Sequence, residues 1–252
     1  MAMSVWIAAG LMVAVFVTST LSGVFGMAGG MILLWSLLLL LPVEAAIAVH
    51  GIIQVVANGS RAWFSRVYVD WRILGLIVAG LLLSALLLLL VRYEPDARVV
   101  YFVIGLLPIL VWIPKRWLAL DAAKPHHAVL CGLVAGGLNL TVGLSGPTVD
   151  VFFIRTQMDR RTVIATKAAT QVVSHAAKIA FYANAAVTLT GGEWGAIALA
   201  APMAILGTRA GAAILHRMSD AGFRTWTRWI VTAIGLVYLV QGVMLVARGG
   251  FS

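Results

Sequence analysis

The chain has 252 residues, of which 62% are hydrophobic and only 11% are charged. Soluble domains contain about 25% charged residues, so this composition excludes a soluble globular protein and indicates an integral membrane protein. The formal net charge of +9 comes from Lys and Arg scattered over short loops, which fits the orientation signal of membrane proteins better than a nucleic-acid-binding surface, and we expect no nucleic-acid partner.

The first half of the chain, residues 1–114, is predicted to form one membrane repeat made only of helices. Its N-terminus lacks the positively charged start of a signal peptide, so we interpret it as a retained first span. In chain order, the repeat has a span, a glycine-rich break, a short helix of about half a bilayer, a helix with a polar stripe, and two further spans. These occupy residues 4–22, 23–30, 31–41, 44–65, 71–91 and 98–113.

Residues 115–125 form a polar linker that we place in the cytoplasm, and residues 126–252 repeat the plan of the first half. The last-but-one segment contains Gly207 and Gly211, whose spacing suits close helix packing. The leucine run over residues 86–90 leaves two interpretations open, a lipid-facing surface or the contact of a homodimer. The segments of the second repeat are a span, a break, a short helix, a striped helix and two spans, over residues 126–140, 141–147, 148–154, 161–187, 193–216 and 224–246.

Two of these helices carry matching polar stripes. In each, polar residues follow the i, i+4, i+8, i+11 spacing that places side chains on one face of a helix. Residue numbers in the two stripes differ by 117, as 171 and 54 do, and the same offset aligns FGMAGG (25–30) with VGLSGP (142–147). A duplicated glycine-rich break followed by a polar-striped helix is typical of a transporter with internal repeats. The matched pairs are His50 and Lys167, Gln54 and Gln171, Asn58 and His175, and Arg61 and Lys178.

The stripes predict an anion site near the middle of the membrane. Gln54 and Gln171 each lie about 15 Å from the start of their helix, half of a hydrocarbon core of roughly 30 Å. If the halves are inverted, these glutamines approach each other, with Arg61 in the inner and Lys178 in the outer half of the membrane. A cation in hydrocarbon costs at least about 2.5–3.5 kcal/mol, which a bound anion would offset. The alternative is that the stripes are hydrogen bonds between packed helices.

The glycine-rich breaks would add backbone hydrogen-bond donors to the cations of the predicted anion site. The short helices after them would expose backbone N–H groups and positive dipole ends at membrane depth. Packing glycines are the alternative explanation. The predicted break residues are Gly26, Gly29, Gly30, Gly143, Gly146 and Pro147, and neutral donors beside the second break are Asn139, Thr141, Ser145 and Thr148.

The distribution of basic loops predicts the topology. Eleven of the 18 Lys and Arg residues fall in loops that share one side if each repeat has five segments, and the positive-inside rule makes that side cytoplasmic. Both termini are then outside and the second repeat is inverted relative to the first. An eight-span arrangement with parallel repeats is the alternative. The eleven residues are Arg61, Arg66, Arg72, Lys115, Arg116, Lys124, Arg155, Arg160, Arg161, Arg217 and Arg224.

Ionisable residues inside apolar segments give two further hypotheses. Asp150 is predicted to form an ion pair with Lys167 or Lys178, or to bind a coupling proton, as could His50 or His175. The sequence GLSG (143–146), with a later histidine, also matches the GxSG of rhomboid intramembrane proteases. The first-repeat counterpart of its serine is Ala28, so we expect no catalytic residues. Cys131 is the only cysteine, and we predict no metal site and no cofactor.

The break FGMAGGMIL, the helix around VHGIIQVVANGSR, their second-half counterparts and GTRAGAAIL (207–215) together resemble the TauE/SafE sulfite exporter family, also called toluene sulfonate uptake permeases. The resemblance covers essentially the whole chain, although Ala28 interrupts the glycine run that the family often has. It implies a bacterial inner-membrane exporter or permease for small sulfur-containing anions such as sulfite, sulfoacetate or other organosulfonates. The chain has no P-loop, so transport uses an ion gradient or none, and a passive anion channel is the alternative to a secondary transporter.

Overall fold

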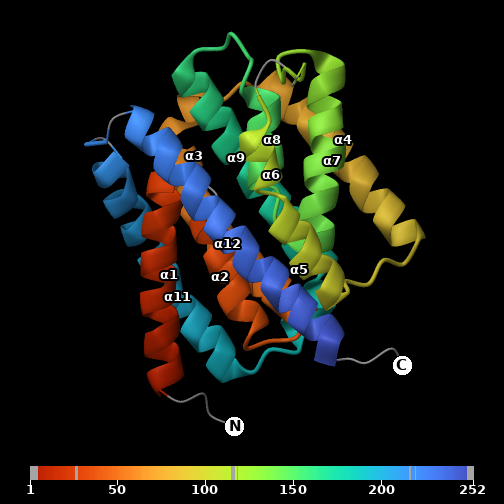
Figure 1. Ribbon diagram of the computed structural model, residues 1–252, viewed down its shortest axis with the longest axis vertical. Helices are drawn as coiled ribbons and strands as arrows, with labels where there is room; N and C mark the ends of the chain where they lie inside the picture. Colours follow the sequence, from red (N-terminus) through yellow and green to blue (C-terminus); the bar gives the residue numbers. More distant parts are fainter. Residues whose placement is uncertain are drawn as a thin grey trace.

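The computed structural model describes residues 5–25, 28–114, 117, 119–215, 217–218 and 220–248. Throughout these residues every regular element is a helix (Figure 1). The predicted all-helical membrane protein is therefore confirmed. Five helical stretches are long and apolar enough to cross a membrane, namely Ala8–Phe25, Val43–Tyr68, Trp71–Leu90, Gly191–Leu215 and Thr225–Arg248.

The helices of the first half begin and end within a few residues of the predicted positions. The number of helices differs in one place, because the predicted span over 98–113 is divided into two helices at Pro108. Proline has no N–H to continue the helical hydrogen bonds. The helices are α1 (Val5–Phe25), α2 (Ala28–Leu38), α3 (Val43–Ser65), the 3-10 turn η1 (Arg66–Tyr68), α4 (Trp71–Leu90), α5 (Ala97–Leu106) and α6 (Ile109–Trp112).

The second half shows the same succession of helices. The predicted striped helix over 161–187 is divided at Tyr182, and the short helix begins at Gly146 rather than Thr148. The helices are α7 (Pro125–Val142), α8 (Gly146–Phe153), α9 (Arg160–Phe181), α10 (Ala183–Val187), α11 (Gly191–Leu215) and α12 (Asp220–Arg248). Shifting the bounds of α1, α2 and α3 by 117 places them on α7, α8 and α9 to within three residues.

Aspartates define three of the helix starts. The side chains of Asp70, Asp96 and Asp159 each precede a helix and accept hydrogen bonds from backbone N–H groups of its first turn, before α4, α5 and α9 respectively. An N-cap of this kind satisfies donors that otherwise have no partner within the helix. These three carboxylates are therefore committed to local structure.

The first glycine-rich stretch differs from the predicted eight-residue break. α1 continues through Gly23 to Phe25 and α2 begins at Ala28, so only residues 26–27 separate them, and the predicted break residue Gly26 lies outside the described residues. A Cβ at Gly29 would overlap the carbonyl oxygen of Thr18, and one at Gly23 would lie 2.8 Å from the Cα of Gly211. These two glycines permit close helix packing, and the expected packing role of Gly211 is confirmed.

The second break is a true interruption of the helix. Gly143 has a φ of +81°, the left-handed conformation that glycine adopts without a steric penalty, and it ends α7. Three residues later Gly146 and Pro147 begin α8, with proline in the first turn where its missing N–H costs nothing. The sequence GLSGP is therefore read correctly as a break.

The long helices pair between the two halves of the chain. α1 lies along α11 on one side of the molecule and α4 along α7 on the other, as Figure 1 shows, while α3 lies along α9 and α5 along α12. The offset of 117 places α1 on α7 and α4 largely on α11, so it converts the α1–α11 pair into the α7–α4 pair, and it converts α3–α9 into itself. Each half therefore supplies one partner of every major helix pair.

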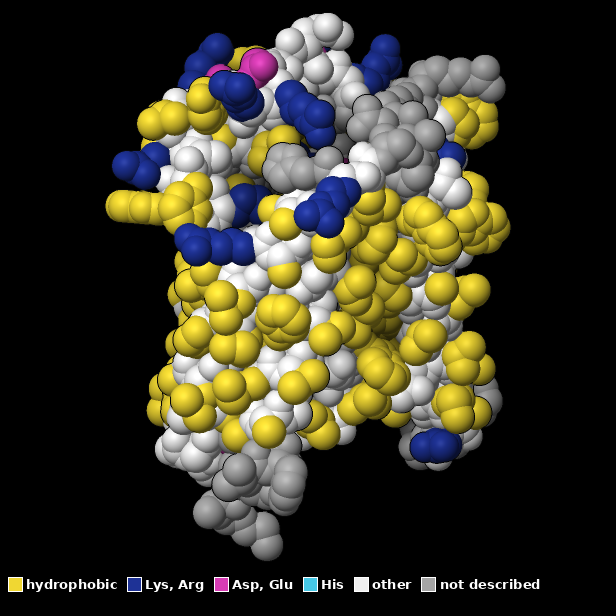
Figure 2. All heavy atoms as spheres, turned by 90° about the vertical axis from the view of Figure 1, so that its left-hand side faces the viewer, with side chains coloured by type: hydrophobic (Ala, Val, Ile, Leu, Met, Phe, Trp, Pro, Cys, Tyr) yellow, Lys and Arg dark blue, Asp and Glu magenta, His cyan; other side chains and the backbone are white. Residues whose placement is uncertain are grey.

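Basic and hydrophobic side chains occupy different parts of the surface, as expected for a membrane protein. Figure 2 shows Lys and Arg side chains gathered toward the end drawn uppermost, and hydrophobic side chains covering much of the face below them. The starts of α4, α7 and α9 lie at this basic end, whereas the start of α1 and the end of α12 lie at the opposite end (Figure 1). On α4, leucines 82, 83, 86 and 87 are exposed, which suits contact with lipid.

Candidate functional site

A cluster of buried polar side chains forms where α3 lies along α9. We call it the central polar cluster and define it as His50, Gln54 and Asn58 of α3 together with His175 and Lys178 of α9. Each is at most 9% exposed, and Lys178 is completely enclosed. All five belong to the two predicted stripes, so the stripes do face each other across the two halves.

Lys178 occupies the centre of this cluster. Its Nζ donates a hydrogen bond of 2.9 Å to the carbonyl oxygen of Gly143 and lies 2.8 Å from Nδ1 of His50. The left-handed turn at Gly143 ends α7, so Nζ of Lys178 lies at the negative end of that helix. Lys178 thus joins the second-half break to the first-half stripe.

The hydrogen bonds continue from His50 along α3. Its Nε2 lies 3.1 Å from the carbonyl oxygen of Gly30, and the amide of Gln54 lies 3.3 Å from the same Nε2. Asn58 then donates to the side-chain oxygen of Gln54 over 3.0 Å. The ring of His175 packs edge-on against His50, with ring centres 5.6 Å apart. The cluster is a continuous chain of polar contacts inside an apolar bundle.

Two glycines make room for this chain. A Cβ at Gly30 would lie 3.0 Å from the Gln54 amide nitrogen, and one at Gly51 would lie 3.0 Å from Cε of Lys178. Any larger residue at either position would press on the cluster. Gly30 was predicted only as a break residue, and Gly51 was missed, although its place one residue after His50 on a polar-striped helix was a signal for close approach.

Two tyrosines that the sequence analysis missed hold the breaks from other helices. The hydroxyl of Tyr182 donates to the carbonyl oxygen of Leu140 over 2.6 Å, and that of Tyr238 donates to Met31 over 2.7 Å. Both tyrosines are buried. Leu140 lies in the last turn of α7, where carbonyl groups lack an N–H partner within the helix, so Tyr182 satisfies one of them. Tyr238 instead joins α12 to the first turn of α2.

Several buried polar atoms beside the second break lack a partner among the described residues. They are Oγ of Ser145, Oγ1 of Thr148, Oδ1 of Asn139 and Nδ1 of His175. Ser145 and Thr148 are 2% and 5% exposed, and Ser145 precedes α8 without capping it. Buried polar atoms are paired in the great majority of cases, so this group is suited to receive a ligand.

The remaining predicted donors are already committed. Asn139 donates its amide to the carbonyl and hydroxyl oxygens of Ser174 at 2.8 and 3.0 Å. Thr141 donates to the carbonyl oxygen of Gly137 at 2.8 Å, within its own helix. Thr141 is therefore a helix residue whose hydroxyl is already hydrogen-bonded within α7.

The other members of the stripes lie outside the central polar cluster. Lys167 forms a salt bridge with Asp150. Of the two lysines predicted as partners of Asp150, the structure therefore selects Lys167. Both side chains of this pair are about one-third exposed or more. Arg61 and Gln171 are half-buried, and neither side chain has a hydrogen-bond or ion-pair partner in the described part of the chain. No hydrogen bond joins Gln54 to Gln171, so their predicted approach at the midplane is not seen as a direct contact.

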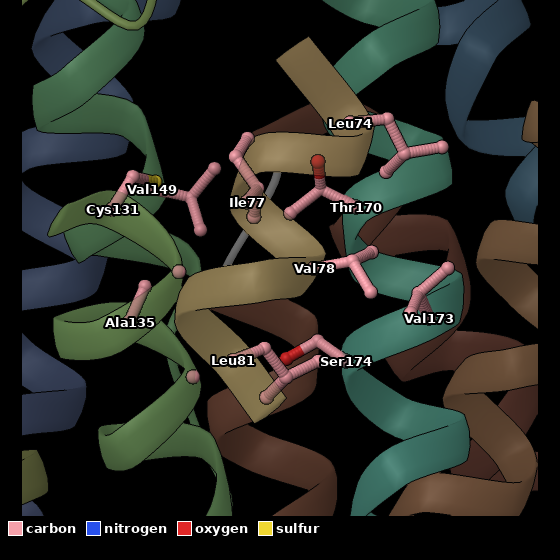
Figure 3. A pocket seen from close by; sticks show the side chains of 12 residues that line it. Leu74, Ile77, Val78, Leu81, Cys131, Ala135, Val149, Thr170, Val173 and Ser174 are labelled. Carbon is pink, nitrogen blue, oxygen red and sulfur yellow. The ribbon is translucent and has the colours of Figure 1, made fainter. Parts of the chain in front are cut away.

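A small cavity lies between α4, α7 and α9, and no residue of the central polar cluster lines it. Figure 3 shows Thr170 and Ser174 of α9 reaching toward it among apolar side chains of α4 and α7. Its volume of about 10 Å³ is the space of one water molecule. An organosulfonate does not fit there.

Two chemical alternatives can be compared with this geometry. Ser145 Oγ has no hydrogen-bond partner among the described residues, so the serine–histidine bond that a protease of the GxSG type requires is not formed with His175. A search of the described residues also finds no group of three or more His, Cys, Asp or Glu side chains that could hold a metal ion.

Comparison with known proteins gives one match. The family model described as Sulfite exporter TauE/SafE matches residues 11–238, a range that contains both breaks, both stripes and the whole central polar cluster. Comparison with curated proteins and with solved structures gives no match.

Proposed function

Because the chain belongs to the TauE/SafE sulfite exporter family, we propose that it is a secondary transporter of small sulfur-containing anions, namely sulfite, sulfoacetate or other organosulfonates, in the bacterial inner membrane. The observation that carries this proposal is the enclosed Lys178 beside partnerless donors at the start of a short helix. A buried cation, neutral donors and a helix N-terminus together favour an anion.

The proposed anion site is the start of α8. The first helical N–H groups, those of Gly146 and Thr148, have no acceptor within the helix, and Pro147 between them has no N–H. The hydroxyls of Ser145 and Thr148 add two donors that tetrahedral or pyramidal sulfur oxyanions accept from several directions. Lys178, hydrogen-bonded to Gly143 just before this turn, contributes positive charge.

Alternating access between two inverted halves is the proposed mechanism. Under the offset of 117 the helix pairs α1–α11 and α4–α7 exchange, while α3–α9 maps onto itself. This exchange is what a two-fold relation between the halves would produce, and the α3–α9 seam then lies on the axis. Rocking of one half against the other would open the site to each side of the membrane in turn.

Inverted halves require an odd number of crossings per half, which places both termini on the same side of the membrane, and the basic loops make that side the outer one. We expect an alkaline phosphatase fusion after Ser252 to be active and a green fluorescent protein fusion there to be dark, because only the first matures outside the cytoplasm. Fusions in the 115–125 linker should give the opposite pattern. A fluorescent C-terminal fusion would contradict the inverted arrangement.

Transport of labelled anions into proteoliposomes tests the function itself. We expect sulfite or sulfoacetate to be taken up in preference to sulfate, and to accumulate when an ion gradient is imposed. A channel would equilibrate the anion without saturation and without accumulation against its gradient. Failure to move any of the three anions would contradict the proposal.

Loss of one hydroxyl at the proposed site should have a graded effect. We expect Ser145→Ala to weaken sulfoacetate binding roughly threefold to tenfold, the range of one hydrogen bond of about 0.5–1.5 kcal/mol. Isothermal titration of the purified protein measures it, with Ser36→Ala as the control because that serine bonds within α2. Labelling of Ser145 by a fluorophosphonate, abolished by His175→Ala, would instead favour a protease.

A further inference from the structure

We propose that Lys178, with His50 as its partner, is a proton-binding site, and that anion binding loads a proton onto the Lys178 amine. The inference rests on the proposed function and adds the identity and place of the coupling ion. The sequence pointed to Asp150 or a histidine for this role, whereas the geometry points to the lysine.

The hydrogen-bond partners of Lys178 suit both forms of its amine. Gly143 offers a carbonyl oxygen, which only accepts, and Nδ1 of His50 accepts when the proton of the neutral ring is on Nε2. The carbonyl oxygen of Gly30, 3.1 Å from Nε2, favours that tautomer. An –NH₂ group has two hydrogens for these two acceptors, and an –NH₃⁺ group has a third. A proton can therefore bind or leave without loss of either contact.

That third hydrogen and the extra charge find no anionic partner in the described surroundings. The titratable groups facing Lys178 are His50 on α3 and His175 on α9. Tyr182, one turn further along α9, donates its hydroxyl to Leu140 and lies within electrostatic reach of Glu44, which is near the start of α3. On α8, Asp150 is bound to Lys167. Within α2, α7 and α10 no Asp or Glu occurs.

The charge of a bound anion supplies what is missing. With no anion, the enclosed amine is uncharged, because an enclosed ammonium without a counter-charge has lost its hydration. When the anion binds at the start of α8, the lone pair of Nζ takes up one proton from the aqueous phase that is open at that time. The ammonium then balances one negative charge, and anion and proton leave together on the other side. The direction of the proton gradient sets the direction of net transport.

Proton uptake on binding tests the proposal directly. Sulfoacetate is fully ionised at neutral pH, so any proton taken up belongs to the protein. We expect about one proton per bound sulfoacetate from titrations in buffers of different ionisation enthalpy, and an affinity that falls roughly tenfold per pH unit between pH 7 and 9. Binding without proton uptake and with a flat pH dependence would overturn the proposal while leaving the transporter function intact. Absence of binding of every sulfur anion would overturn the transporter function.

Two variants locate the proton. Lys178→Arg carries a charge that is never lost, so we expect binding without proton uptake and without the pH dependence. Lys178→Met, measured at sulfoacetate concentrations raised to saturation, should also take up no proton. Arg248→Gln, at the end of α12, should behave as the parent. Proton uptake that persists in either Lys178 variant and disappears in Asp150→Asn would assign the proton to Asp150 and overturn the proposal, so one folded lysine variant is enough for the test.

Discussion

Replacement of Lys178 by methionine is expected to weaken sulfoacetate binding by roughly tenfold or more, which corresponds to about 1.4 kcal/mol per decade. The lysine is enclosed, and its head group bridges the second break and the first stripe. A hydrogen bond to a charged partner contributes about 1.5–3 kcal/mol, and the variant loses the charge that balances the anion. Isothermal titration of purified parent and variant gives the affinities.

The same replacement should lower stability, and this effect can be measured separately. Methionine leaves the carbonyl oxygen of Gly143 and Nδ1 of His50 without their donor, and each unsatisfied buried group costs about 1–3 kcal/mol. A Lys178→Met protein that is less stable but binds sulfoacetate as tightly as the parent would show that the lysine is only structural. Arg248→Gln is the control, with no change expected in either quantity.

The sequence predicted the helices, the two stripes and the second break because each leaves a local signal. Polar residues at helical spacing within apolar segments show which helix faces turn inward, and His50 and Lys178 of these stripes are enclosed in the structure. The sequence GLSGP combines a residue that adopts left-handed backbone with a proline that begins a helix. Such signals need no knowledge of distant parts of the chain.

The partners within the site could not be predicted in the same way. Spacing gave Gln54 and Gln171 equal depths, but the hydrogen bonds depend on the side-chain lengths and on the rotation of α3 against α9, and the side-chain oxygen of Gln54 accepts from Asn58 in its own helix. Tyr238 reaches Met31 from a helix about 200 residues later, a contact with no local signal. The role of Gly23 also appears only when α11 is placed beside α1.

The close packing of α4 against α7 provides the second large effect, because this helix pair joins the two halves of the chain. A Cβ at Gly80 of α4 would overlap the carbonyl oxygen of Val129 on α7, and one at Gly132 would overlap that of Ile77. Backbone atoms cannot move aside as a flexible side chain does, so the two helices would have to separate. We expect Gly80→Ala to lower the free energy of unfolding by about 1–3 kcal/mol, the usual cost of overpacking.

The chain offers both a matched control and a built-in probe for this measurement. Gly75 lies in the same helix with no atom within 4 Å of an added Cβ, so Gly75→Ala should be neutral or stabilising by up to about 1 kcal/mol, the gain in helix propensity. Cys131, the single cysteine, is fully buried beside Gly132, and a thiol-reactive dye will label it only as the α4–α7 contact opens on heating. Equal melting curves for the two alanine variants would contradict close packing of α4 on α7, and with it the joining of the two halves through this pair.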